Sequence, residues 1–169
     1  LCKAYDSRPF VTVGSQLKLK KCVELGAVDG AVRTAADFWD RVRSFPNPFG
    51  YDVILDSVGG AYLDANLSLL NPKGRLVIIG LMGGSKGNLN LSEVLMKRIK
   101  IIGSTLRSRS LIDKASLMNT LEKEVWPRFL SGQLLPVVEA IYPFSAAGEA
   151  HELMASNKTI GKIVLSKII

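Results

Sequence analysis

Residues 51–60 read YDVILDSVGG, an apolar run that closes on two adjacent glycines. Val53, Ile54 and Leu55 are apolar without alternation, which is typical of parallel strands that are covered on both faces. Residues 75–80, RLVIIG, repeat this pattern and also end at a glycine. The intervening chain is long enough for one crossover helix, and residues 71–74, NPKG, form a turn signal before the second run. We interpret this stretch as a strand–helix–strand unit of a parallel sheet.

The same alternation continues in both directions along the chain. We expect strands at residues 10–13, 51–56, 75–80, 99–106, 137–142 and 161–165, and helices at 16–25, 36–44, 60–70, 91–97, 111–130 and from Ser145 to Met154. Pro46, Pro48 and Gly50 predict a turn before the strand at 51–56. Strands separated by helices at this spacing predict an α/β fold with a doubly wound parallel sheet, covered by helices on both faces.

Short glycine- or hydroxyl-bearing sequences follow four of the predicted strands. They are Gly14-Ser15, residues 56–60 (DSVGG), residues 80–84 (GLMGG) and residues 104–107 (STLR). Ligands of open parallel sheets bind beyond the carboxyl ends of the strands. A glycine pair alone can serve a turn, but at a strand end it also lets a flat ligand lie against the backbone. Four such ends in a row predict a ligand crevice.

The end of the first predicted strand has the character of a phosphate site. In dinucleotide folds an acidic residue at the end of the second strand favours NAD, whereas a small or basic residue admits the 2′-phosphate of NADP. Here Gly14 and Ser15 are followed by Lys18, with no Asp or Glu at the strand end. A hydroxyl, helix-start N–H groups and a lysine would together bind a phosphate. A simpler interpretation stays open, with Ser15 only a helix cap and Lys18 on a solvated face.

Composition narrows the classes of function. The chain has 22 Lys and Arg against 15 Asp and Glu, a net charge of +7, but these residues are scattered and no nucleic-acid motif accompanies them. We therefore expect no nucleic-acid partner. Two cysteines and one histidine do not make a disulfide scaffold or a zinc module. The apolar runs fall short of the roughly 20 residues of a membrane-spanning helix, and no secretory signal is visible. We expect a cytoplasmic location, with an organelle as the alternative.

No residue pair indicates nucleophilic or acid–base catalysis. We interpret His151 as a structural or surface residue, Cys22 as a small core residue, and Asp52 and Asp56 as strand-end residues. The G-x-G-x-x-G fingerprint of a dinucleotide fold is absent from the sequence. The first predicted strand instead has the features of that fold's second strand. We expect the chain to begin one strand and one helix late, and Leu1 in place of Met favours part of a longer chain.

Several segments together carry a resemblance to a known family. They are residues 11–15 with Lys18, 25–27, 51–60, 74–84, 106–109, 134–137, 141–143, 149–151 and 157–165. The chain resembles the C-terminal half of a zeta-crystallin-type quinone oxidoreductase, in the medium-chain dehydrogenase/reductase superfamily. It is most similar to the branch that a tumour suppressor induces in animals. The resemblance covers nearly the whole chain, although each motif alone is weak.

The resemblance implies an NADPH-dependent, zinc-independent reductase of quinones and other α,β-unsaturated carbonyls. By position, Gly14, Ser15 and Lys18 would hold the adenosine 2′-phosphate. Arg33 stands where many relatives have Tyr, and its guanidinium could pair with the same phosphate. The other implied cofactor contacts are Val58 and Gly59 along the cofactor, Gly80, Leu81 and Met82 near the nicotinamide ribose, Thr105, Leu106 and Arg107 beside the nicotinamide, and Thr159, where relatives often carry Asn. No catalytic acid or base is implied.

The resemblance also implies a domain organisation. Residues 1–133 would form a partial Rossmann-like NAD(P)-binding domain without its first strand and glycine-rich loop, and residues 134–169 would return to an absent GroES-like domain that supplies the substrate pocket. We expect a homodimer through the strand at 99–105, or association with an N-terminal half or a larger assembly. Three explanations compete: a partial or cleaved chain, a truncated gene product, and a non-catalytic scaffold or interaction subunit.

Overall fold

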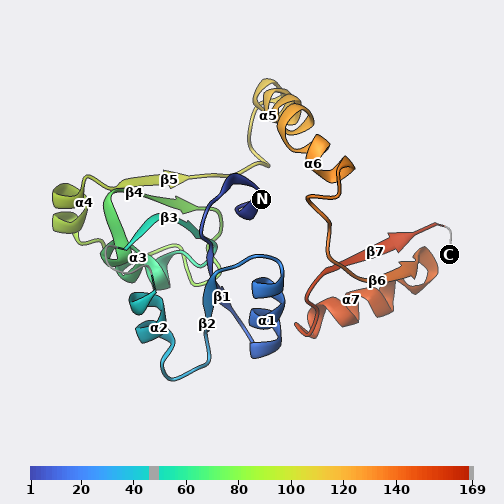
Figure 1. The fold of residues 1–169 in the computed structure, drawn as a ribbon, viewed down its shortest axis with the longest axis horizontal. Helices are drawn as coiled ribbons and strands as arrows, with labels where there is room; N and C mark the ends of the chain where they lie inside the picture. The colour runs from blue at the N-terminus through green and yellow to red at the C-terminus, as the bar shows by residue number, and fades with distance from the viewer. Residues whose placement is uncertain (46–49, 168–169) are drawn as a thin grey trace. The chain divides into compact units, whose positions relative to one another are not determined.

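The computed structural model describes residues 1–45 and 50–167 (Figure 1). The chain divides into two compact units, which we call unit 1 (residues 1–35 and 118–169) and unit 2 (residues 36–117). The turn expected at Pro46 and Pro48 lies outside the described residues. Within the described ranges, no helix has the length and apolar character to cross a membrane.

Unit 2 is built on a three-stranded parallel sheet with β4 (Leu70–Ile78) between β3 (Tyr51–Asp56) and β5 (Lys100–Gly103) (Figure 1). In register, Ile54 pairs with Leu76, and Leu76 with Ile101. Leu76 is fully buried. It belongs to a core that also contains Leu67, Leu70 and Ile99. The strands predicted from the two apolar runs are confirmed, and the strand expected at 99–106 is shorter because only residues 100–103 pair.

Both helices that follow these strands pack on one face of the sheet. Leu67 of α3 (Leu63–Leu69) and Val94 of α4 (Leu91–Lys97) meet the Leu76 core. On the other face Val53 is 46% and Leu55 66% exposed. Within unit 2, α3 and α4 therefore share one face of the sheet. Unit 2 also contains the short α2 (Phe38–Ser44), a 3-10 turn (Gly60–Tyr62) and the first half of α5 (Leu111–Glu124).

The turn expected at residues 71–74 lies within β4. Tyr51 pairs with Leu70 and Val53 with Arg75, so the pairing skips residues in β4. Lys73 adopts a left-handed conformation, with φ 66°. The residues predicted to form a turn therefore form a β-bulge, which bends β4 without ending it.

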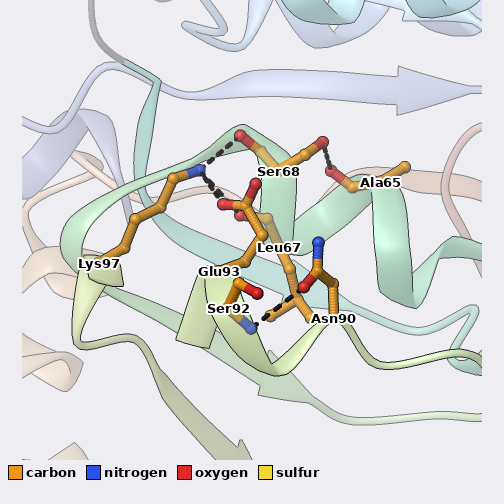
Figure 2. A network of polar contacts seen from close by, with 7 residues as sticks. All are labelled: Ala65, Leu67, Ser68, Asn90, Ser92, Glu93 and Lys97. Atoms are coloured by element: carbon orange, nitrogen blue, oxygen red, sulfur yellow. Dashed lines mark hydrogen bonds and ion pairs between the residues drawn. The ribbon is translucent and has the colours of Figure 1, made fainter. Parts of the chain in front are cut away.

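A lysine links α3 and α4 (Figure 2). Lys97 Nζ donates to the carbonyl oxygens of Ser68 at 2.8 Å and Leu67 at 3.3 Å, and pairs with Glu93 at 2.7 Å. The last carbonyls of a helix have no partner within it, so a cation there satisfies them and complements the helix dipole. At the start of α4, Asn90 Oδ1 accepts from the Ser92 amide at 3.0 Å.

Unit 1 begins with β1 (Phe10–Val13), α1 (Gln16–Glu24) and β2 (Asp29–Val32), in which the two strands are parallel and α1 packs on both. Gly26, with φ 107°, follows the end of α1, as expected. We did not predict β2, because its residues Asp29 and Gly30 are poor strand formers. A Cβ on Gly30 would lie 2.5 Å from both Leu19 Cδ1 and the Val11 carbonyl, so the strand needs glycine for close packing.

The rest of unit 1 holds α6 (Trp126–Leu130) and the parallel pair β6 (Val138–Pro143) and β7 (Lys162–Ser166), with α7 (Ala147–Ala155) between them. The single helix expected at 111–130 is wrong: α5 (Leu111–Glu124) ends before α6, whose first turn contains Pro127. Proline lacks an amide hydrogen and cannot continue the α5 ladder. The expected Ser145 cap is also wrong, because a 3-10 turn (Phe144–Ala146) precedes α7.

Candidate functional site

The carboxyl end of β1 leads directly into the N-terminus of α1. Ser15 is the N-cap, and its Oγ accepts a hydrogen bond from the Lys18 amide at 3.3 Å. The first turn of α1 carries no acidic residue. Free N–H groups and the helix dipole make such an end favourable for an anion.

Lys18 stands one turn into α1 and its side chain reaches the C-terminal part of the chain. The Nζ atom donates to the carbonyl oxygen of Asn157 at 2.6 Å. Asn157 follows α7, with φ 56°, and precedes Thr159 by two residues. The ammonium group retains two further N–H donors, since lysine has three. It is therefore held in place and still able to bind an anion.

Arg33 lies beside Gly14 at the neighbouring strand end. Its amide donates to the Val13 carbonyl at 2.8 Å, which continues the β1–β2 pairing by one residue. A Cβ on Gly14 would lie 3.5 Å from Nη2 of Arg33, so the guanidinium borders the glycine. Arg33 is exposed, and no carboxylate of the described residues forms an ion pair with it. Unit 1 thus presents a hydroxyl, an ammonium and a guanidinium around one strand end.

In unit 2 the carboxyl end of β3 folds into a tight turn organised by Asp56. This carboxylate is only 4% exposed. Its Oδ1 accepts from the Val58 amide at 2.7 Å and its Oδ2 from the Gly59 amide at 3.0 Å. Gly59 has φ 81° and ψ −128°, a conformation that side chains beyond glycine rarely adopt.

The end of β4 is hydrogen-bonded to this turn. The amide of Ile79 donates to the Asp56 carbonyl at 2.7 Å, and Gly83 donates to the Val58 carbonyl at 2.7 Å. Gly60 in turn donates to the Gly84 carbonyl at 2.8 Å. We call residues 56–60 and 79–84 together the double loop. The structure therefore brings Val58 and Gly59 together with Gly80, Leu81 and Met82.

Close backbone approach explains the glycines of the double loop. A Cβ on Gly80 would lie 2.9 Å from the Ser57 carbonyl, and one on Gly83 would lie 2.6 Å from Val58 Cγ1. Leu81 and Met82 are exposed, at 54% and 77%. The double loop thus offers glycine backbone and apolar side chains, a suitable surface for a flat ring.

The other predicted site residues follow β5 and α7. Thr105, Leu106 and Arg107 are exposed. Arg109 Nε donates to the Thr105 carbonyl at 3.0 Å, and Lys114 Nζ to the Arg107 carbonyl at 3.1 Å. These bonds hold the backbone of residues 105–107 and leave the side chains of Thr105, Leu106 and Arg107 without a role in them. Thr159 belongs to unit 1 and is partly buried. It lies in the segment of chain that connects α7 to β7.

Two residues of these sites did not figure among the sequence candidates. Asp56 was interpreted only as a strand-end residue, although an Asp followed by turn residues and Gly59 is a known signal for side-chain capping of a turn. Asn157 contributes a backbone carbonyl, which no side-chain pattern reveals. Across the described residues no group of three or more His, Cys, Asp and Glu lies close enough to hold a metal ion.

Comparisons with known proteins match the chain over most of its length. A family model described as zinc-binding dehydrogenase matches residues 25–165. Human quinone oxidoreductase is 25% identical over 168 residues, which cover 98% of this chain and 49% of that protein. The chain thus spans about half the length of the curated relatives that it matches.

Two solved structures show the same architecture. An NAD-dependent alcohol dehydrogenase is 30% identical with a TM-score of 0.76, over 97% of this chain and 45% of that one. Escherichia coli quinone oxidoreductase, complexed with NADPH, is 24% identical with a TM-score of 0.79, over 97% of this chain and 51% of that one. At the latter identity the likeness shows the fold alone.

Proposed function

The chain belongs to the zinc-binding dehydrogenase family, and from this premise we propose that it is the nucleotide-binding half of an NADPH-dependent reductase. Its substrates would be quinones or α,β-unsaturated carbonyls. The observation that carries the proposal is the end of β1, where Lys18 and Arg33 flank Gly14 and Ser15 without a carboxylate in the first turn of α1.

The family and the fold of the chain are established. The expected resemblance to a quinone oxidoreductase of the medium-chain dehydrogenase/reductase superfamily, over its C-terminal half, is confirmed. The expected α/β fold, matching the Rossmann-like NAD(P)-binding half of such enzymes, is confirmed too. A nicotinamide cofactor follows from this family. Assignment to the tumour-suppressor-inducible branch remains a prediction, as does the boundary between residues 133 and 134.

The choice of NADPH rests on charge at the β1 end. The similar structures include one described as NAD-dependent and one complexed with NADPH, so similarity alone does not select the cofactor. An acidic residue there would bind the ribose hydroxyls of NAD, whereas cations bind the extra phosphate of NADP. In our proposal Gly14 leaves room for the phosphate, Ser15 and the α1 amides donate to it, and Lys18 and Arg33 neutralise it.

The double loop would hold the nicotinamide end. Val58 and Gly59 would lie along the cofactor, and Gly80, Leu81 and Met82 near the nicotinamide ribose. Thr105, Leu106, Arg107 and Thr159 would supply further contacts. Each assignment is made within its own unit, and each can be tested with the matching fragment of the dinucleotide.

The chemistry of the proposed reaction belongs to the cofactor, whose reduced nicotinamide supplies a hydride. The chain's own residues bind the phosphate, orient the ring against glycine backbone, and exclude water with Leu81 and Met82. No acid or base is assigned. The described residues offer no ligand set that fits zinc, despite the family's description, and we derive no step through a metal.

Calorimetry with NADPH and NADH tests the proposal. We expect micromolar NADPH binding and at least about tenfold weaker NADH binding, because one phosphate paired with two cations contributes on the order of 1.5 to 3 kcal/mol. Lys18→Glu should remove the preference, whereas Lys20→Glu, an equal charge change at an exposed position of α1, should preserve it.

Equal binding of the two cofactors, or an equal effect of the two substitutions, would contradict the phosphate assignment. Absence of binding by either cofactor would instead favour the scaffold or interaction subunit that the sequence also allows.

A further inference from the structure

The buried carboxylate of Asp56 organises the turn that follows β3. A carboxylate that is 4% exposed loses most of its hydration, which is costly unless hydrogen bonds replace it. The amides of Val58 and Gly59 replace it at 2.7 and 3.0 Å. Hydrogen bonds to an ionised acceptor are stronger than neutral ones. The carboxylate therefore fixes two successive peptide units of the turn.

Fixing these peptide units also sets the direction of the turn's carbonyl groups. The carbonyl of Ser57 accepts from the Met82 amide at 3.2 Å, and that of Val58 accepts from Gly83 at 2.7 Å. Asp56 itself accepts from Ile79 through its backbone carbonyl at 2.7 Å. One residue thus uses its side chain on one loop and its backbone on the other.

We propose that Asp56 is a positioning residue for the nicotinamide end of the cofactor, an inference that rests on the proposed function. Its carboxylate fixes the turn at residues 56–60. The backbone carbonyls of this turn then accept from the amides of residues 79–84, so that Gly59 and Gly80 present a preformed surface to the ring. Asp56 does not touch the ligand. It acts by removing the conformational freedom that binding would otherwise have to suppress.

The test compares Asp56→Asn with Asp52→Asn. The asparagine keeps one carbonyl oxygen for Val58 but turns an NH2 group toward one of the two backbone donors, since an amide accepts through one atom only. Asp52 lies at the other end of β3, is exposed, and accepts from Asn71 Nδ2 at 2.8 Å. Both substitutions remove one negative charge from the same strand.

Binding is measured with NADPH and with adenosine 2′,5′-bisphosphate, which carries only the adenosine end assigned to unit 1. We expect Asp56→Asn to weaken NADPH about tenfold or more, with bisphosphate binding unchanged. Asp52→Asn should change neither. Unchanged NADPH binding in Asp56→Asn, or equal weakening of both ligands, would overturn the positioning role. If the unsubstituted chain binds neither ligand, the proposed function fails and this inference fails with it.

Folding of unit 2 is monitored separately. The chain has two tryptophans, and Trp126→Phe leaves Trp39, which packs on Phe38 and Tyr62 in unit 2, as the only one. Its fluorescence reports whether Asp56→Asn remains folded at the binding temperature.

Hydrogen exchange on the unsubstituted chain gives a second readout that no folding defect can affect. NADPH, but not the bisphosphate, should slow exchange of the Val58 and Gly59 amides. Equal exchange with both ligands would contradict the proposal.

Discussion

At the scale of single residues, two glycines of the double loop have positive φ, and each position requires glycine for a different reason. Gly59 has φ 81°, and a Cβ there would lie 2.8 Å from Leu81 Cδ2 and 2.9 Å from the Gly84 carbonyl. Gly84 has φ 105°, with nothing within 4 Å of its would-be Cβ. The first glycine is needed for both conformation and space, and the second for conformation alone.

Substitution by alanine separates these two demands. We expect Gly59→Ala to lower the free energy of unfolding by about 3 kcal/mol, since backbone strain and steric overlap add in the folded state. Gly84→Ala should cost about 1 kcal/mol from strain alone. Urea unfolding followed by Trp39 fluorescence in a Trp126→Phe background measures both. Equal losses would show that the double loop is less tightly packed at Gly59 than its contacts indicate.

The sequence predicted that residues at the end of β1 form a binding site, but it did not predict how their side chains are arranged. The sequence indicated Ser15 and Lys18 from the absence of an acidic residue, and Arg33 only through a family resemblance. The bond from Lys18 to the Asn157 carbonyl joins residues 139 positions apart. No local pattern encodes such a contact, because a backbone carbonyl is available at every position.

At the scale of elements, α3 is short and depends on a neighbour for its C-terminal cap. Lys97 supplies that cap from α4 and also pairs with Glu93 (Figure 2). The two side chains are only 26% and 30% exposed, so solvent screens this pair less than it would screen a surface pair.

Removing this cap should lower stability measurably. We expect Lys97→Met to lower the free energy of unfolding by about 1 to 2 kcal/mol, measured by thermal or urea unfolding. The Ser68 carbonyl and Glu93 lose the lysine as a partner, while the Leu67 carbonyl keeps only the Leu70 amide. Lys100→Met, at an exposed position of β5, should change stability by less than about 0.5 kcal/mol. Equal effects of the two substitutions would mean that the cap contributes nothing beyond the general charge of this region.

Elements with a strong hydrophobic pattern were predictable, and those decided by packing were not. The apolar runs of β3 and β4 identified these strands, and apolar spacing together with Gly26 identified α1. In contrast, β2 contains Asp29 and Gly30 and is stabilised by close contact with β1 and Leu19. Likewise, the signal at residues 71–74 has the composition of a turn, and only pairing with β3 makes it a bulge.

At the scale of the whole molecule, the proposed homodimer through residues 99–105 remains to be tested. Among the described residues, β5 is hydrogen-bonded to one strand, β4, and all of its residues are exposed. Ile101 and Ile102 are each 40% exposed. An exposed apolar edge strand is a ready surface for pairing with a second chain.

A single charge on this edge should weaken association. We expect Ile102→Lys to shift sedimentation from dimer to monomer at micromolar concentration, because a buried ammonium opposes close packing of two edges. Leu135→Lys, at a position that is 74% exposed, places the same charge in unit 1 and should leave association unchanged. A monomeric unsubstituted chain, or equal dissociation of both variants, would contradict dimerisation through β5.

The central claim is that this chain binds the two ends of NADPH at two separate sets of residues. Titration of the ¹⁵N-labelled chain, followed by amide chemical shifts, tests this most directly. We predict that adenosine 2′,5′-bisphosphate shifts Gly14, Ser15, Lys18 and Arg33, and that NADPH shifts these and the double loop as well. Shifts confined to other parts of the chain, or no shifts at millimolar NADPH, would contradict the account.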